Sequence, residues 1–175
     1  KQQVLAENFA HIGRVQPETW LPPIAGAAWG YRRRARLGVR LVPKKGGVII
    51  GFRERRCSFV TQLDACLTLD PRASRLLPAL HELITGRSRP NRLPQIEVAV
   101  GDDVCALVFR HLEPLTDADR ERFELFGAEH EVQIFLQPQG IDSVQSLFPP
   151  DPVPLTYRLP KRDVCIEFRP TDFIQ

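Results

Sequence analysis

Apolar residues recur along the chain with two periods, one typical of helices and one typical of strands. Spacings of three and four residues predict helices over residues 1–14, 71–85 and 116–126. In the second of these, Leu76, Leu80 and Leu83 share one face before Gly86 ends the pattern. Alternation and short apolar runs predict strands over residues 31–42, 48–53, 57–60, 96–100, 104–112, 132–136, 155–159 and 164–168.

Short turn sequences separate neighbouring strands. They are Pro-Lys-Lys-Gly-Gly at residues 43–47, Gly-Asp-Asp at 101–103 and Pro-Lys-Arg-Asp at 160–163. Because short connections favour antiparallel pairing, we expect an α+β fold with mainly antiparallel sheets and two to four helices.

The strand expected at residues 31–42 has an unusual alternation. One face is apolar or aromatic and would hold Tyr31, Ala35, Leu37, Val39 and Leu41. The other face would hold Arg32, Arg34, Arg36 and Arg40. Guanidinium groups match phosphate geometry and stack on bases, so the sequence predicts an anion-binding strand.

The charge distribution strengthens this interpretation. Residues 30–56 contain ten Lys or Arg and one acid, Glu54, a net charge of +9 within a chain of net charge +3. A basic patch on an otherwise acidic chain favours a polyanionic partner, namely nucleic acid. We therefore also expect Arg53, and Lys44 and Lys45 at the hairpin tip, to bind RNA. The alternative is an edge strand protected by charge, although such protection usually relies on Lys and mixed signs.

Several kinds of chemistry lack support in the sequence. There is no Gly-rich nucleotide loop, and the four histidines are isolated from one another. The turn accounts for Asp102 and Asp103, and the first turn of a helix accounts for Asp117 and Asp119. No apolar run is long enough to span a bilayer, so we expect a cytoplasmic protein.

The four cysteines are too scattered for a disulfide framework. Cys105 and Cys165 lie in apolar runs and are expected to be buried in strands, whereas the roles of Cys57 and Cys66 stay open. The chain begins with Lys1 and contains no Met, which we interpret as a piece of a longer protein.

Taken in order, several segments resemble the bacterial uracil-5 RNA methyltransferases, most closely the branch that acts on 23S ribosomal RNA. The matching segments are residues 29–37, 51–53, 66–71, 114–121 and 169–175. The resemblance implies that residues 1–175 are the central domain of a parent enzyme, without its N-terminal OB-like domain and its C-terminal Rossmann-like domain. The basic strand would then position 23S rRNA through phosphate contacts and stacking by Tyr31, Arg32, Arg34, Arg36, Arg40 and Arg53.

The resemblance also implies two cofactors, S-adenosylmethionine and a 4Fe-4S cluster. Cys66 matches the distant cluster ligand, although Leu67 replaces the usual proline. The three upstream cysteines that complete the cluster in the family are absent from this chain, and Cys57 has no counterpart in the family. Gln175 would contact S-adenosylmethionine, and Phe173 would lie against the flipped uracil.

The family's cysteine nucleophile and base match nothing in this chain, so we expect no catalytic residue here and no activity from the chain alone. Two alternatives are a non-catalytic nucleic-acid-binding or interaction module and the transfer-RNA branch, which has no cluster. Dimerisation through surfaces meant for the missing domains is a further expectation.

Overall fold

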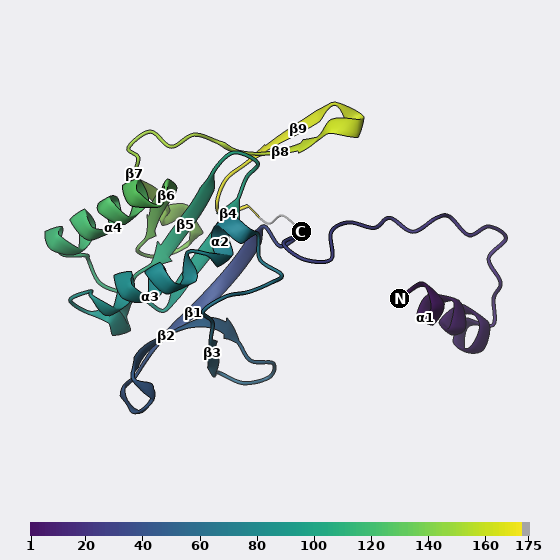
Figure 1. Ribbon diagram of the computed structural model, residues 1–175, viewed down its shortest axis with the longest axis horizontal. Coiled ribbons are helices and arrows are strands. Elements are labelled where there is room, and N and C mark those ends of the chain that lie inside the picture. Colours follow the sequence, from purple (N-terminus) through teal and green to yellow (C-terminus); the bar gives the residue numbers. More distant parts are fainter. Residues whose placement is uncertain (173–175) are drawn as a thin grey trace.

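A seven-stranded sheet forms the framework of the molecule, with the strand order β3-β2-β1-β4-β5-β6-β7 (Figure 1). The computed structural model describes residues 1–172, apart from the side chain of Lys45. The sheet strands are β1 (Arg34–Val42), β2 (Gly47–Arg53), β3 (Val60–Gln62), β4 (Gln95–Val100), β5 (Cys105–Arg110), β6 (Val132–Gln137) and β7 (Gln145–Phe148). A separate two-stranded ribbon consists of β8 (Leu155–Leu159) and β9 (Val164–Phe168).

Helices account for much of the remaining regular structure. They are α1 (Gln2–Glu7), which continues as a π-helical turn over Asn8–Gly13, α2 (Pro71–Ser74), α3 (Leu77–Thr85) and α4 (Asp117–Glu129). Short 3-10 turns occupy Pro43–Lys45, Pro90–Arg92, Ile141–Ser143 and Pro160–Arg162. The predicted α+β class with mainly antiparallel pairing is confirmed. Within residues 1–172, no helix combines the length and apolar character that crossing a membrane requires.

All neighbouring strands of the large sheet are antiparallel except β5 and β6, which are parallel. Parallel neighbours need a crossover, and α4 supplies it. The helix begins where the sequence predicts, because the Thr116 side chain accepts a hydrogen bond of 3.1 Å from the backbone N–H of Asp119.

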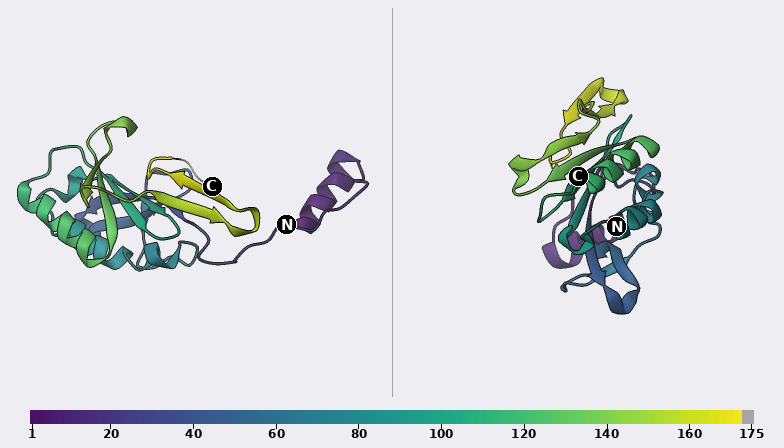
Figure 2. Two further views of the ribbon diagram at one scale, coloured as in Figure 1. Left: turned by 90° about the horizontal axis from the view of Figure 1, so that it is seen from above. Right: turned by 90° about the vertical axis from the view of Figure 1, so that its left-hand side faces the viewer.

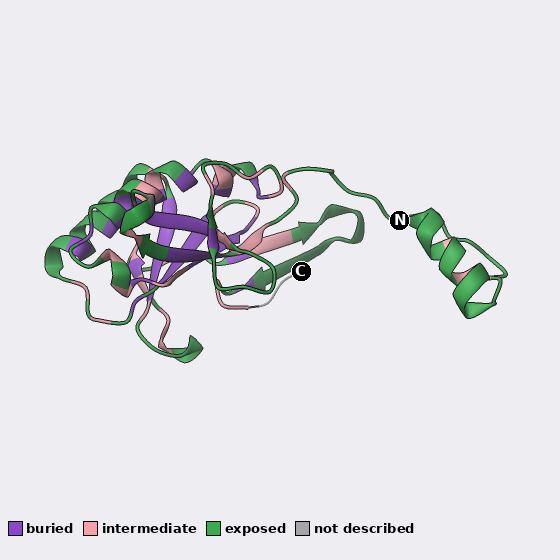
Figure 3. Ribbon diagram, turned by 90° about the horizontal axis from the view of Figure 1, so that it is seen from below, coloured by how far each residue is buried: buried purple, intermediate pink, exposed green. Residues whose placement is uncertain are grey.

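The main core lies between the helices and one face of the sheet. Alternate strand residues such as Leu37, Ile50 and Phe109 are fully buried there. Helix residues including Leu80 and Phe123 pack against them, and the rings of Phe109 and Phe123 have centroids 4.6 Å apart. Burying side chains of this size stabilises the fold by about 1.5–3 kcal/mol each, and Figure 3 shows the sheet as the main buried layer.

The other face of the sheet is covered only in part. A smaller cluster forms where the β8–β9 ribbon begins and ends, through Leu155 and Phe168 against Ala99, Val108 and Phe135 of the sheet. The ribbon then extends away from the body of the molecule (Figures 1 and 2). This cluster spans strands β4 to β6, so the helix-free face of β1 and β2 lies outside it.

Two predicted elements differ from the structure near the basic strand. The strand begins at Arg34 and not at Tyr31, and Tyr31 and Leu41 are exposed instead of joining the apolar face. The third strand is β3 (Val60–Gln62), and residues 57–59 belong to the loop that precedes it.

Two further expectations need correction, and the structure contains one strand that the sequence does not predict. The helix expected over residues 71–85 is divided into α2 and α3. Strand β7 was not predicted. Cys105 is buried as expected, but Cys165 is exposed because β9 belongs to the projecting ribbon and pairs only with β8.

The N-terminal helix lies apart from the sheet, at the end of an extended segment (Figure 1). None of its residues is buried. The segment that follows exposes several large apolar side chains, namely Val15, Trp20, Leu21, Ile24 and Trp29.

Candidate nucleic-acid interface

Strand alternation places Arg34, Arg36 and Arg40 on the face of the sheet that the helices leave uncovered. Their neighbours Leu37 and Val39 are buried in the core on the helix side, so the arginines must face the other way. Arg53 of β2 shares this face, because Ile50, three positions earlier, is buried on the helix side. The predicted common face is therefore found for Arg34, Arg36 and Arg40.

Glu97 of β4 binds two of these arginines. It pairs with Arg36 in the β1–β4 register, and Arg34 Nη2 and Arg36 Nη2 each lie 3.0 Å from a Glu97 carboxylate oxygen. Arg34 also donates to the backbone carbonyl of Asp172, and its side chain is only 17% exposed. Burial lowers the pKa of Arg34, although Glu97 and Asp172 oppose this effect. The side chain of Arg36 is 69% exposed, so it can exchange Glu97 for an external anion.

The remaining predicted cations of this face have no such partner. Arg40, Lys44 and Arg53 are exposed, and within residues 1–172 no ion pair joins them to a carboxylate. Lys44 lies at the tip of the β1–β2 hairpin as expected, while the side chain of Lys45 lies outside the described part of the chain. Unpaired, solvated cations of this kind suit phosphate contacts.

The structure places Arg32 elsewhere. Its guanidinium carbon lies 5.5 Å from the centre of the Phe52 ring, and Phe52 packs against the main core on the helix side. Its backbone bonds to the segment before α2, since its N–H donates to Thr68 and its carbonyl accepts from Asp70. The predicted alternation therefore fails at Arg32, because the regular strand starts two residues later.

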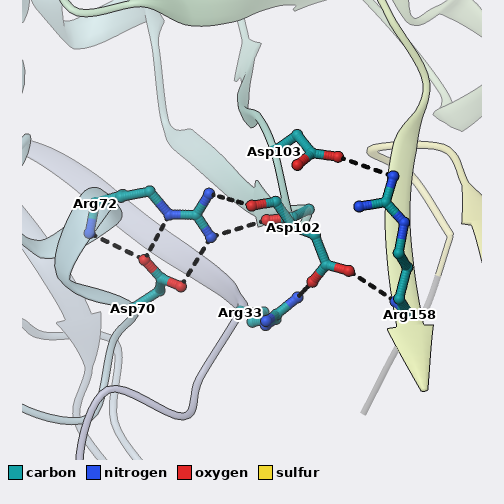
Figure 4. Close-up of polar contacts among 7 residues, drawn as sticks. Arg33, Asp70, Arg72, Asp102, Asp103 and Arg158 are labelled. Atoms are coloured by element: carbon teal, nitrogen blue, oxygen red, sulfur yellow. Dashed lines mark hydrogen bonds and ion pairs between the residues drawn. The ribbon is translucent and has the colours of Figure 1, made fainter. Parts of the chain in front are cut away.

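Asp102 lies in the β4–β5 connection, as the sequence predicts, and it is also the centre of a polar network (Figure 4). Asp102 forms an ion pair with Arg33 and accepts a hydrogen bond of 2.7 Å from the backbone N–H of Arg158. Arg72 donates to the carbonyl oxygens of Gly101 and Asp102 at 2.8 and 2.9 Å. The hydrogen bond from Arg33 is the main cause of the lowered pKa of Asp102. This network ties β1, α2 and the ribbon together, and the sequence spacing contains no sign of it.

Cys66 lies half-buried before α2. Its Sγ is 3.2 Å from Thr68 Oγ1, and its backbone N–H donates to Ser74. Burial alone raises the pKa of the Cys66 thiol, but hydrogen bonds from Thr68 and Leu69 and the charge of Arg32 outweigh it, so the pKa is lowered. Across residues 1–172, no three His, Cys, Asp or Glu side chains gather as metal ligands. A cluster that needs four thiolates does not fit these residues alone.

Phe173 and Gln175 lie outside the described residues. The residue before them, Asp172, is held at two points. Its carboxylate accepts hydrogen bonds from the backbone and the side chain of Arg169, and its carbonyl accepts from Arg34. The chain leading toward residues 173–175 is thus attached to the basic strand.

Comparison with known proteins gives relatives over the whole chain. The chain is 51% identical over all 175 residues to the "23S rRNA (uracil(1939)-C(5))-methyltransferase RlmD" of Aromatoleum aromaticum, and covers 40% of that protein. It is 51% and 49% identical to proteins of the same name from Cupriavidus pinatubonensis and Bordetella pertussis, and covers 38% of each. The chain therefore spans about 40% of the length of these relatives, whose names confirm the predicted resemblance. No family model matches it.

A solved structure shares the fold. It is the Pyrococcus abyssi tRNA (uracil-54, C5)-methyltransferase in complex with S-adenosyl-L-homocysteine, with a TM-score of 0.56 and 17% sequence identity. The likeness covers 85% of this chain and 38% of the archaeal chain. At this identity, the comparison shows the fold alone.

Proposed function

We propose that this chain is the RNA-positioning domain of a longer S-adenosylmethionine-dependent enzyme that methylates C5 of a uridine in 23S ribosomal RNA. The observation that carries the proposal is identity of about half of all residues, over the full chain, with proteins that bear this name. The basic, helix-free face of β1 and β2 supports it, because a surface of unpaired cations suits a folded polyanion.

The geometry suggests how the basic face would work. Arg40, Arg53 and Lys44 contact phosphates directly, and Arg36 joins them by leaving Glu97. Arg34 acts indirectly, because it holds the carbonyl of Asp172 while Glu97 occupies its other guanidinium nitrogen. The resemblance assigns the flipped uracil and S-adenosylmethionine to Phe173 and Gln175, which follow Asp172 in the sequence.

The chemical step belongs to parts of the longer protein outside this chain. Burial raises the pKa of Cys105 to about 12, so this thiol is a poor nucleophile near neutral pH. Cys165 lies in β9 of the projecting ribbon, and the resemblance matches it to no catalytic residue. We accordingly expect no methyl transfer by the 175-residue chain alone. Acting on ribosomal RNA would place the longer protein in the cytoplasm.

We further propose that Cys66 supplies one thiolate of a 4Fe-4S cluster whose other ligands lie outside this chain. The proposal rests on the resemblance, in which Cys66 matches the distant cluster ligand, and on the preference of such clusters for cysteine thiolates. Iron and sulfide analysis of the longer protein checks this proposal. We expect a cluster in the wild type and its loss in Cys66→Ser, with Cys57→Ser as the matched control. A Cys66→Ser protein that keeps its full iron content would contradict it.

Exposed apolar side chains on the N-terminal segment and the ribbon suggest further contacts. Trp20 and Ile24 in the segment, and Val164 and Ile166 in the ribbon, are exposed. In the longer protein they would contact the neighbouring domains, and in the isolated chain they would favour a dimer. Light scattering of the isolated chain at rising concentration tests the second part.

Methyl transfer by the longer protein tests the main proposal. Labelled S-adenosylmethionine is supplied with unmodified 23S rRNA or with unmodified tRNA, and the product is located by nuclease mapping. We expect 5-methyluridine in the ribosomal RNA only. The variant Arg36→Ala/Arg40→Ala/Arg53→Ala should raise KM for RNA by roughly tenfold or more with little change in kcat. Methylation of tRNA alone would support the transfer-RNA branch instead.

A further inference from the structure

Phe59 is an exposed phenylalanine that lines a hollow beside the basic strand. Phe59 is 69% exposed, an unfavourable position for a large aromatic side chain in water. The hollow has a volume of about 360 Å³, and it is lined by Arg40, Val42, Ile49, Ser58, Phe59 and Val60. Val42, Arg40 and Ile49 come from β1 and β2, so the hollow lies at the end of the sheet that carries the unpaired cations.

Glu54, the one acid within residues 30–56, holds the loop that carries Phe59 in place. The backbone N–H of Glu54 donates to the carbonyl of Phe59 at 3.0 Å. The Glu54 carboxylate accepts hydrogen bonds from the Thr61 hydroxyl at 3.0 Å and from the Cys57 thiol at 3.6 Å. These hydrogen bonds of Glu54 hold the loop closed and fix the backbone of Phe59. Within the described residues, no ion pair joins Glu54 to an arginine.

The lining matches a flat ring with apolar faces and polar edges. Ile49 is buried and forms an apolar floor, while the Phe59 ring can stack on one face of a bound ring. The guanidinium of Arg40 and the hydroxyl of Ser58 offer hydrogen bonds at the edge. Exposed arginines within the loop and directly before it, namely Arg53, Arg55 and Arg56, add positive charge there. The ligand should therefore be both aromatic and attached to a polyanion.

We propose that this hollow takes a single unpaired nucleobase of the bound RNA, stacked on Phe59, while the flanking phosphates lie on Arg40 and Arg53. The proposal rests on RNA binding by the basic face and adds a specific base-binding subsite to it. The base proposed for this subsite is a different nucleotide from the target uracil, which the resemblance assigns to Phe173.

A second hollow of about 280 Å³ is a weaker candidate. It is lined by Arg87, Ser88, Arg89, Glu113, Pro114 and Thr116. Both of its arginines form ion pairs within the chain, Arg87 with Asp119 and Arg89 with Glu113. Its charges are therefore already compensated, and it lacks an aromatic wall.

Binding of short single-stranded RNA by the 175-residue chain tests the proposal. Fluorescence anisotropy compares a labelled oligoribonucleotide of about twelve residues with one of the same length whose nucleotides are abasic. The protein variants are Phe59→Ala, Phe59→Trp and, as a control, Leu125→Ala, which removes a similarly exposed apolar side chain from α4. Far-ultraviolet circular dichroism verifies that each variant is folded.

We expect Phe59→Ala to weaken binding of the normal oligonucleotide by about 5- to 100-fold, with the salt dependence unchanged. Phe59→Trp should bind about as well as the wild type, and Leu125→Ala should be unaffected. The abasic oligonucleotide should bind wild type and Phe59→Ala equally weakly, because the base that stacks is absent.

Two results would overturn the subsite alone, and a third would overturn the proposed function as well. If the wild type binds RNA in a salt-dependent way but Phe59→Ala binds equally well, the subsite is wrong and the basic face still stands. Equal binding of the normal and abasic oligonucleotides by the wild type would also overturn the subsite. The hollow would then be better explained by an apolar protein partner. If the wild type binds no RNA at any salt concentration, both proposals fail.

Discussion

Arg34 on β1 donates a hydrogen bond to the backbone carbonyl of Asp172, 138 residues later in the chain. Its other guanidinium nitrogen lies 3.0 Å from Glu97, and the side chain is only 17% exposed. The first residue of the basic strand therefore holds the C-terminal segment of the described chain. In this respect Arg34 differs from Arg40, which is exposed and has no ion pair within residues 1–172.

The first prediction distinguishes a structural role for Arg34 from an RNA-binding role for Arg40. Arg34→Ala should lower the free energy of unfolding by about 1–3 kcal/mol, because it removes charge-assisted hydrogen bonds from partly buried partners. Arg40→Ala should change stability by less than about 0.5 kcal/mol and should weaken RNA binding more than Arg34→Ala does. Urea unfolding and RNA titrations of both variants check this. A stable Arg34→Ala protein with the larger loss of RNA affinity would mean that Arg34 contacts RNA.

The second prediction concerns Glu97, which would compete with RNA for Arg36 under the proposed function. Glu97→Gln removes one negative charge from the basic face and weakens the hold on Arg36. RNA affinity should therefore rise by roughly a few-fold at low salt and approach the wild-type value at high salt. The matched control is Glu124→Gln, the same change on the exposed side of α4. An equal rise in both variants would show that only net charge matters.

The third prediction concerns a buried ion pair that helps to join α4 to the end of α3. Arg87 Nε lies 3.7 Å from Asp119 Oδ2, with side chains 2% and 5% exposed, and Ser88 donates to the same carboxylate at 2.6 Å. Asp119→Ala leaves the Arg87 charge buried without its partner, so we expect a loss of about 3–5 kcal/mol at pH 7. Urea unfolding measures it, with Asp117→Ala in the same helical turn as the control. A loss under about 1 kcal/mol would contradict the arrangement.

The Arg87–Asp119 ion pair also predicts that stability depends on pH. Burial tends to raise the pKa of Asp119, but hydrogen bonds from Ser88 and the charge of Arg87 outweigh it and lower the pKa. Its stabilising contribution is therefore complete above the unfolded pKa of about 3.9, and it is lost as the pH falls through the lower folded pKa. The stability difference between wild type and Asp119→Asn should shrink below about pH 4. A difference that stays constant into strong acid would contradict the assigned role.

The fourth prediction concerns the close contact between β2 and β3. A Cβ atom at Gly51 would lie 1.8 Å from the carbonyl oxygen of Thr61, which is backbone and cannot move aside cheaply. Gly51→Ala should therefore destabilise the protein by about 3 kcal/mol or more and detach β3, together with the loop that carries Phe59. Gly140→Ala is the control, since nothing lies within 4 Å of its Cβ position. Equal stability of both variants, measured in urea, would contradict this packing.

The sequence predicts the strands well where alternation and turn chemistry act together. The ribbon strands Leu155–Leu159 and Val164–Phe168 match their predicted bounds, because each alternates and Pro160 to Asp163 forms the turn between them. Strand β7 has only four residues and lies next to Pro149, so its own pattern is too short to be distinguished from a loop.

Long-range contacts explain what the sequence could not predict. Arg32 lies on the helix side because its backbone pairs with the segment before α2, and no local periodicity encodes that pairing. Glu97 lies more than sixty residues from Arg34 and Arg36, and Asp102 lies 69 residues from Arg33. The apolar run around Cys165 predicts a buried residue, but only the end of its strand, at Phe168, packs against the sheet, so residues 164–167 are exposed.

The most direct test of the basic face is the salt dependence of RNA binding by the 175-residue chain. Arg36→Ala/Arg40→Ala is compared with Arg75→Ala/Arg120→Ala, which removes the same charge from α4 and the end of α2. If Arg36 and Arg40 contact phosphates, the slope of log affinity against log salt should fall in magnitude by roughly 1.4 in the first variant only. Equal slopes and equal affinities in the two variants would show that RNA does not bind this face of the sheet.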